Sequence, residues 1–346
     1  MTPLLSPYLS FLNGDALDCT GSTTAGLKWL QREGYGFADT YAKNQLPLDG
    51  LKIAYDQKLR YSTLQFRVPP ELGRKLPGLP VPYDECGVIY CLLADPEKEN
   101  RGVYSQRIDG DFSRWFFFAG LKLLIPYLEC KFVSVSLVEI GAELPKNLEE
   151  GKVWCRSLIT EVPIPEGWFA MLDMLEEVED SMTGSQVRFA PSTWIRYEKA
   201  VNLPSNWIAA GDSVMRVNPL HGHGCSKAMY GAICLNRLLQ DVQSSIPEDF
   251  SQRYFRMHAA KIEPLWDTTK VADYAFPSTV PVRGETLSQG SWLRWYMKRL
   301  MTLSLTDAQA GSAIWHFRVL LAPSIDLLQS RLLLKVIWNF IKHPLA

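Results

Sequence analysis

The residues best placed to do chemistry lie in one segment of the chain, 206–240. An apolar run, Trp207 to Ala210, predicts a short strand. That strand ends at Gly211-Asp212, the chain then turns at Asn218-Pro219, and Gly222-His223-Gly224 opens a helical pattern. A strand, an acidic residue, a glycine loop and a helix together predict a ligand-binding arrangement.

The residue types in this segment indicate the chemistry of the ligand. A helix that begins at a glycine turn presents unpaired backbone N–H groups and the positive end of its dipole. Gly222 and Gly224 carry no Cβ, so a flat ligand can approach the backbone closely. Asp212, just past the end of a strand, can accept hydrogen bonds from sugar-like hydroxyls. We therefore expect a flat heterocycle that carries a polyol chain.

The spacing of Gly211-Asp212-Ser213, Asn218-Pro219 and Gly222-x-Gly224 resembles the second flavin motif of FAD-dependent monooxygenases of the aromatic-hydroxylase type. The resemblance implies that Asp212, after Gly211, binds the ribityl chain of FAD. It also implies that Gly222, His223 and Gly224 face the edge of the flavin ring. Earlier in the chain, Asp18-Cys19-Thr20-Gly21 resembles the family's Asp-Ala-Thr-Gly turn, which implies that Asp18 and Gly21 lie beside the dinucleotide.

The family resemblance also implies an activity. FAD would be the cofactor and NAD(P)H the co-substrate that reduces it, and O2 would then hydroxylate or epoxidise a hydrophobic small molecule of the kind made in secondary metabolism. Because the cofactor carries the difficult steps, no catalytic side chain is identified and none of the usual hydrolase patterns is required. Neither the choice between NADH and NADPH nor the substrate follows from the residues.

One departure from the family concerns the dinucleotide end of FAD. The family opens with a GxGxxG turn that holds the pyrophosphate, and this sequence contains none, since the nearest string, 222–227, lacks the third glycine. We therefore expect that an amino-terminal FAD-binding segment has been lost, split off or omitted. Two alternatives stay open: a flavin-free or inactive descendant that acts as a binding protein or a non-redox cyclase, and a flavin-dependent reductase or dehydrogenase.

The composition excludes several other classes of protein. The chain has 346 residues, 47% of them hydrophobic, and 36 basic against 37 acidic side chains give a net charge of -1. A disordered chain would be less apolar, and a nucleic-acid binder would carry a basic excess. The seven cysteines form no CxxC pair, so no metal site is expected.

The sequence also bears on the compartment and on membranes. No secretory signal is recognisable, so we expect a cytoplasmic protein. The most apolar stretch, 115–138, is interrupted by Lys122, Glu129 and Lys131, so no spanning helix is expected. The apolar helix expected at 332–341 either docks on the core or makes peripheral contact with a membrane surface.

The elements that must position these motifs predict a mixed α/β fold. It would comprise an incomplete FAD-binding Rossmann-like domain, an antiparallel substrate sheet and a helical C-terminal region. The expected strands cover 9–17, 51–68, 88–94, 115–118, 132–138 and 207–210. Helices are expected around 27–30, at 172–180, after Gly222 and from residue 249 onward. The expected divisions are 1–50, a remnant of the FAD-binding domain, 51–190, the substrate sheet, 191–245, the FAD segment, and 246–346, the helical region.

Overall fold

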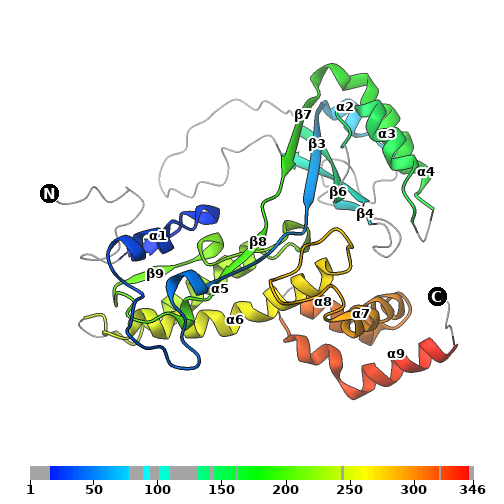
Figure 1. Cartoon of the computed structure of the whole chain (residues 1–346). Helices are drawn as coiled ribbons and strands as arrows, with labels where there is room; N and C mark the ends of the chain where they lie inside the picture. The colour runs from blue at the N-terminus through cyan, green and yellow to red at the C-terminus, as the bar shows by residue number, and fades with distance from the viewer. Residues whose placement is uncertain are drawn as a thin grey trace. The chain divides into compact units, whose positions relative to one another are not determined.

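The chain folds into two compact units of mixed α/β structure (Figure 1). The computed structural model describes residues 16–77, 89–93, 101–109, 131–140, 144–160, 163–242, 245–318 and 321–342. Unit 1 combines Met1–Gln57 with Pro191–Ala346, and unit 2 is Lys58–Ala190. Unit 1 is therefore discontinuous in sequence, and unit 2 is inserted into it.

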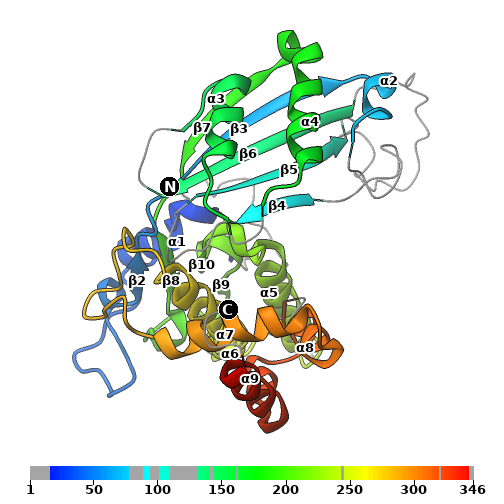
Figure 2. The same ribbon diagram turned by 90° about the vertical axis from the view of Figure 1, so that its right-hand side faces the viewer.

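Unit 2 is built on a five-stranded antiparallel sheet with the strand order β4-β5-β6-β3-β7. The strands are β3 (Leu59–Val68), β4 (Ile89–Leu93), β5 (Arg101–Asp109), β6 (Lys131–Ile140) and β7 (Thr183–Arg188). Helices α3 (Leu148–Arg156) and α4 (Glu166–Met174) cover one face of it (Figure 2), and the short α2 (Pro70–Gly73) follows β3. The strands expected at 88–94 and 132–138 and the antiparallel layer are confirmed, whereas 115–118 lies outside the described residues.

The alternation of buried and exposed side chains along β3 explains why the helices pack on one face of this sheet. Leu64, Phe66 and Val68 are buried, whereas Gln65 is only partly buried and Arg67 is exposed. Because successive residues of a strand point to opposite faces, the three apolar side chains meet one layer only. That layer consists of helical residues such as Leu148, Trp154, Cys155, Trp168, Met171, Leu172 and Leu175.

Two expected elements differ from the structure. The strand expected at 51–68 is two strands, β2 (Lys52–Tyr55) and β3, which belong to different sheets. The chain turns between them because Lys58 takes a left-handed φ of 55° and the side-chain oxygen of Gln57 accepts the N–H of Ser192. The alternation of apolar and polar residues continues through this turn, so the sequence pattern predicts one strand where the structure has two.

The helix expected at 172–180 is wrong in its extent. It is the end of α4, which stops at Met174 and continues as a 3₁₀ helix, Leu175–Ser181, that is interrupted at Val178. Four acidic residues crowd this stretch at positions 176, 177, 179 and 180. Carboxylates three or four residues apart repel one another along a regular α-helix, which disfavours its continuation.

Unit 1 contains two small sheets and most of the helices. A parallel pair joins β1 (Ala16–Asp18) to β9 (Trp207–Ala209), and a second sheet has the order β10-β8-β2, with β8 Ser192–Ile195 and β10 Met215–Arg216. The helices are α1 (Ala25–Arg32), α5 (Gly224–Leu239), α6 (Phe250–Asp273), α7 (Ser291–Ser304), α8 (Ala308–Arg318) and α9 (Ser330–Lys342). The strand at 207–210, the helices near 27–30 and after Gly222, and the helical C-terminal third are confirmed. Of the strand expected at 9–17, only residues 16 and 17 are described, and they lie in β1.

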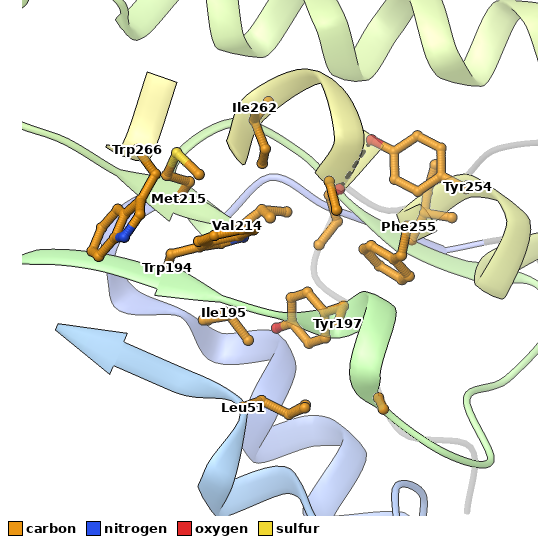
Figure 3. Close-up of a cluster of buried hydrophobic side chains, with 14 of the residues drawn as sticks. Leu51, Trp194, Ile195, Tyr197, Val214, Met215, Tyr254, Phe255, Ile262 and Trp266 are labelled. Atoms are coloured by element: carbon orange, nitrogen blue, oxygen red, sulfur yellow. Dashed lines mark hydrogen bonds between the residues drawn. The ribbon is translucent and has the colours of Figure 1, made fainter. Parts of the chain in front are cut away.

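An aromatic core fixes α6 against the strands of unit 1 (Figure 3). Tyr197 and Phe255 lie with their ring centroids 4.8 Å apart, and Trp194 packs 6.0 Å from Trp266. The hydroxyl of Tyr254 donates to the carbonyl of Ala209 at 3.1 Å, as the dashed line in Figure 3 shows. Buried aromatic rings contribute a large apolar area, and this hydrogen bond ties α6 to the end of β9.

Helices α7 to α9 share a smaller core of their own, made of Tyr296, Leu300, Leu303, Ala310, Leu327, Leu332 and Val336. The hydroxyl of Tyr296 donates to the carbonyl of Leu327 at 2.5 Å and links α7 to the segment before α9. Among the described residues, no helix is both long and apolar enough to cross a lipid bilayer.

Candidate functional site

The two sequence motifs meet where β1 and β9 end. In the parallel register Asp18 lies opposite Ala209, and the N–H of Ala210 donates to the carbonyl of Asp18 at 3.0 Å. Both strands continue into short 3₁₀ helices, Gly21–Thr23 and Gly211–Ser213. The N–H of Gly21 donates to Oγ of Ser213 at 2.9 Å, although the two residues are 192 positions apart.

Asp18 holds the first of these turns from inside. Its carboxylate is fully buried, and Oδ1 accepts the N–H and the hydroxyl of Thr20 at 2.9 and 2.7 Å. Oδ2 accepts the N–H of Gly26 in α1 at 2.9 Å. A Cβ at Gly26 would lie 2.4 Å from that oxygen, which explains the glycine. Asp18 therefore orders the turn and the start of α1.

Asp212 is placed differently, with 45% of its side chain exposed. Its Oδ1 accepts a hydrogen bond from the ammonium of Lys227, a buried side chain of α5 that also donates to the carbonyl of Met215. Burial lowers the pKa of Lys227, and the nearby Asp212 carboxylate opposes that shift. Within the described part of the chain no donor reaches Oδ2, so one carboxylate oxygen is oriented and available.

Four glycines in the two turns and at the start of α5 have open space beside their backbone. A Cβ built at Gly21, Gly211, Gly222 or Gly224 would meet no atom of the described residues within 4 Å. Gly211 and Gly222 also have φ values of 64° and 72°, a left-handed conformation that side chains disfavour. A flat ligand can therefore approach the main chain along this edge of unit 1.

The start of α5 closes the edge. The helix begins at Gly224, and no side chain caps it at His223, so its first N–H groups and the positive end of its dipole are available to a ligand. Nδ1 of His223 lies 3.5 Å from the hydroxyl of Thr269, and its ring stacks on that of His221. Burial lowers the pKa of His223 to about 4, so the imidazole is neutral at neutral pH.

A buried carboxylate, Asp273 at the end of α6, fixes the loop before α5. Its Oδ1 accepts from the side-chain amide of Asn218 at 2.8 Å and lies 3.1 Å from Nε2 of His221. Its Oδ2 accepts the hydroxyl of Tyr55 at 2.8 Å. Burial is the main cause that raises the pKa of Tyr55, so the phenol stays protonated and donates. The 218–222 loop is thereby held against the core.

All seven residues expected from the sequence thus lie together in unit 1. Gly21, Gly211, Asp212, Gly222 and Gly224 form the open edge, which we call the glycine edge, while Asp18 is buried behind it and His223 lies at its base. Sequence reasoning missed Lys227, Asp273 and Tyr55. The signal that could have found Lys227 is its helical spacing, four residues before Gly231 and seven before Cys234, with which it shares the buried face of α5.

The described residues contain no group of three or more His, Cys, Asp or Glu side chains that could hold a metal ion. The charged and titratable groups near the glycine edge include Asp212, Lys227, Arg216 and the two histidines. These groups can orient hydroxyls and accept or donate hydrogen bonds at a ligand. The arrangement is therefore suited to binding and orienting an organic ligand.

No protein-family profile matches the chain. A curated relative, Protein Rv3254 of Mycobacterium tuberculosis (strain ATCC 25618 / H37Rv), is 30% identical over 88 residues, which are 25% of this chain and 19% of that protein. The chain thus spans about a fifth of this relative.

Similar solved structures include two flavin-dependent enzymes and one protein in complex with FAD. The flavin-dependent brominase Bmp2 and Klebsiella pneumoniae HpxO complexed with FAD and uric acid are each 12% identical, with TM-scores of 0.39, over 75% of this chain and 50% of theirs. BrvH, a flavin-dependent halogenase from Brevundimonas sp. BAL3, is 13% identical, with a TM-score of 0.37, over 75% of this chain and 37% of its own.

Proposed function

We propose that the glycine edge binds the flavin ring and ribityl chain of FAD, and that the protein is an FAD-dependent oxidoreductase. The reaction we propose is monooxygenation of a hydrophobic small molecule with NAD(P)H and O2. One observation carries the proposal: two turns and a helix start converge on an open backbone edge beside a half-exposed carboxylate. A flat ring with a hydroxylated chain fits that combination of features.

The residues present fit this part of the cofactor. Gly222 and Gly224, where a Cβ would project into open space, would lie against the ring, and the N–H groups at the start of α5 would face its polar edge. Asp212 would accept hydrogen bonds from the ribityl hydroxyls. When bound, FAD would supply hydride acceptance and activation of O2.

The protein's own residues would orient these contacts. Lys227 holds Oδ1 of Asp212 and leaves the other oxygen directed to the hydroxyls. The positive end of the α5 dipole favours negative charge at the ring edge. Asp273 keeps the 218–222 loop in place through Asn218, so the two glycines need not be ordered when the ligand binds. A preformed site of this kind lowers the entropic cost of binding.

The hydrophobic substrate is assigned to unit 2 in this proposal. Its antiparallel sheet provides a rigid layer, and the helices that cover one face of it supply an apolar core. Flavin chemistry needs an enclosed apolar surface more than it needs charged catalytic groups. This assignment does not depend on the flavin site, so it can be wrong while the proposed flavin site is right.

The first test is flavin binding by the purified full-length protein. Titration with FAD, and separately with FMN, should quench flavin fluorescence and shift the visible absorbance. Replacing Asp212 by alanine should weaken binding by about tenfold or more, because hydrogen bonds to a charged group are worth about 1.5–3 kcal/mol. A wild-type protein with no affinity for either flavin would contradict the proposal and favour the flavin-free alternative.

A matched pair of glycine variants separates ligand contact from backbone strain. Gly222 and Gly34 both have a left-handed φ, 72° and 79°, and open space where a Cβ would stand. Alanine at either position should cost about 1–2 kcal/mol of stability for the left-handed conformation. Only Gly222→Ala should weaken flavin binding, and equal flavin affinities for the two variants would exclude ring contact at Gly222.

Oxygen consumption distinguishes the proposed reaction from its redox alternative. With NAD(P)H and an acceptor substrate, a monooxygenase consumes O2 in step with NAD(P)H oxidation and places oxygen in the product. A reductase or dehydrogenase converts its substrate equally well without O2. Conversion of the substrate without O2 would be consistent with the proposed flavin site, but it would replace monooxygenation by reduction or dehydrogenation as the proposed reaction.

A further inference from the structure

Helix α9 carries apolar side chains on two opposite sides. One side packs into the small C-terminal core, where Leu332 and Val336 are buried together with Tyr296 and Leu300 of α7. A surface helix of a globular protein usually needs only one such stripe. The second apolar side of α9 therefore requires a separate explanation.

The second side is an exposed stripe with helical spacing. It consists of Leu334, Ile337, Trp338 and Ile341, whose exposed fractions are 68%, 46%, 59% and 63%. These positions follow the pattern i, i+3, i+4, i+7, so the four side chains lie on one face of the helix. We call this set the outer face of α9.

The charges of α9 are all of one sign and lie along one flank of the outer face. Arg331, Lys335 and Lys342 are spaced four and seven residues apart, and the helix contains no acidic residue. Lys335 pairs with Asp307, the residue before α8, at 2.6 Å, whereas the ammonium of Lys342 lies 4.9 Å from the ring centre of Trp338. The segment 291–342 has seven lysines and arginines against two aspartates, in a chain whose net charge is -1.

Exposed tryptophans accompany these charges in the same helical segment. Trp292 and Trp295 of α7 and Trp315 of α8 are all exposed. The ring of Trp295 packs edge-on against Phe340 of α9 at 5.3 Å, which places it beside that helix. Tryptophan rings next to lysine and arginine are typical of side chains that lie at the boundary between lipid and water.

We propose that the outer face of α9 binds the surface of a bilayer that contains anionic lipids. The helix would lie in the plane of the interface, with its four apolar side chains among the acyl chains and its basic flank at the phosphate level. It would not cross the bilayer, because 13 residues rise about 20 Å and the hydrocarbon core is about 30 Å thick.

The one-sided charge favours a lipid surface over a second copy of the chain. A two-fold contact through the outer face would bring the same basic flank of each copy close to that of its partner, which like-charge repulsion disfavours. An anionic bilayer instead complements Arg331 and Lys342 at once, whereas Lys335 is already paired with Asp307. The proposal does not depend on flavin binding and can be tested without it.

Vesicle flotation of the full-length protein tests the proposal. We expect the protein to float with vesicles of phosphatidylcholine and phosphatidylserine, to bind pure phosphatidylcholine vesicles more weakly, and to be released by salt. Its tryptophan emission should shift to the blue on binding. Removing the charges in Arg331→Gln and Lys342→Gln should each weaken binding about fivefold, since a basic residue near an anionic surface contributes about 1 kcal/mol.

A matched pair of apolar variants addresses the outer face itself. The triple variant Leu334→Gln, Trp338→Gln, Ile341→Gln should lose at least about tenfold in vesicle binding, because it removes the inserted apolar surface. The double variant Met229→Gln, Ile233→Gln removes exposed apolar side chains from α5 and should bind as the wild type does. Urea unfolding of all variants checks that each one folds.

Three outcomes would overturn the proposal. Wild-type protein that floats with neither vesicle type would show that no lipid surface is bound. A triple variant that folds and binds like the wild type would place the contact elsewhere. A concentration-dependent dimer seen by light scattering, lost in the triple variant and unaffected by vesicles, would assign the outer face to a second copy.

Discussion

Asp18 and Asp212 stand at the ends of neighbouring parallel strands, and the structure gives them opposite surroundings. Asp18 is fully buried, and its two oxygens accept three hydrogen bonds from Thr20 and Gly26. Asp212 is about half exposed and accepts one hydrogen bond, from Lys227, within the described part of the chain. One carboxylate is committed to its own turn, and the other keeps an oxygen for a ligand.

The difference shows what decides the role of a carboxylate at a strand end. Both residues are aspartates near the end of a strand, Asp18 as the last residue of β1 and Asp212 in the 3₁₀ helix after β9, but the donors that follow in the sequence differ. Thr20 and Gly26 come within eight residues of Asp18 and enclose it, whereas the residues after Asp212 leave it beside open glycines. Stability should therefore depend mainly on Asp18, and ligand affinity mainly on Asp212.

The largest effect is expected from Asp18→Ala. The change leaves the buried N–H of Gly26 and the partly buried N–H of Thr20 without an acceptor, and a buried group without a partner costs about 1–3 kcal/mol. We expect a loss of about 4 kcal/mol in the free energy of unfolding. Urea unfolding followed by circular dichroism measures it, with Asp18→Asn, which keeps one acceptor oxygen, as the intermediate control. A loss smaller than that of Asp212→Asn would refute the comparison.

The second prediction concerns the pair of Asp212 and Lys227. Asp212→Asn leaves a buried ammonium without its counter-ion, and we expect a loss of about 2 kcal/mol, less than for a fully buried pair because Asp212 is half exposed. Adding Lys227→Met should restore most of this stability but not flavin affinity. A double variant as unstable as the single one would show that Lys227 is held by other contacts.

The third prediction uses pH at the start of α5. The pKa of His223 is about 4 in the folded protein, and an unfolded histidine titrates near about 6.5. As the pH falls through this window the unfolded chain binds the proton first, so stability that is complete above about pH 6.5 is lost progressively towards pH 4.

For His223 we expect this loss to reach about 1–2 kcal/mol after allowing for partial access of solvent. His258, whose pKa burial also lowers to about 4, contributes in the same direction. His223→Gln should flatten the dependence of stability on pH in part, and His258→Gln should do so independently. An unchanged slope in His223→Gln would mean that its imidazole is not desolvated in the folded protein.

The smallest effect is expected from Ser213→Ala. The variant removes the acceptor that joins the N–H of Gly21 to the second turn, and a neutral hydrogen bond contributes about 1 kcal/mol. Urea unfolding measures the loss in the free energy of unfolding. Ser22→Ala, in the first turn next to Gly21, provides a solvent-accessible control. Equal losses in the free energy of unfolding for Ser213→Ala and Ser22→Ala would indicate that only the pairing of β1 with β9 holds the two turns together.

Much of the glycine edge could be predicted from the sequence because its signals are local. A strand, a positive-φ glycine and a helix start follow one another within a few residues, so Gly211, Gly222 and the start of α5 were found at the right positions. The meeting of Gly21 with Ser213 follows from the parallel pairing of β1 and β9, which a local pattern does not reveal.

The residues that were missed act over long separations. Asp273 lies 52 positions after His221 and belongs to a long helix, where one acidic residue is unremarkable until the fold buries it. Lys227 resembles a solvated lysine because its partners, Asp212 and the carbonyl of Met215, lie outside α5. The division of 51–68 into two strands was missed for the same reason, since Gln57 is fixed by Ser192.

The antiparallel pairing of β2 with β8 shows how unit 2 is inserted into unit 1. Tyr55 lies opposite Ser192, so the points where the polypeptide leaves and re-enters unit 1 are adjacent across one ladder. To unit 1, the whole of unit 2 is therefore equivalent to the loop of a β-hairpin, and the entropy of closing such a loop grows only slowly with its length. Excising residues 58–190 and joining the two strands by a short turn should leave a unit 1 that still folds, a minimal scaffold on which the glycine edge can be studied alone.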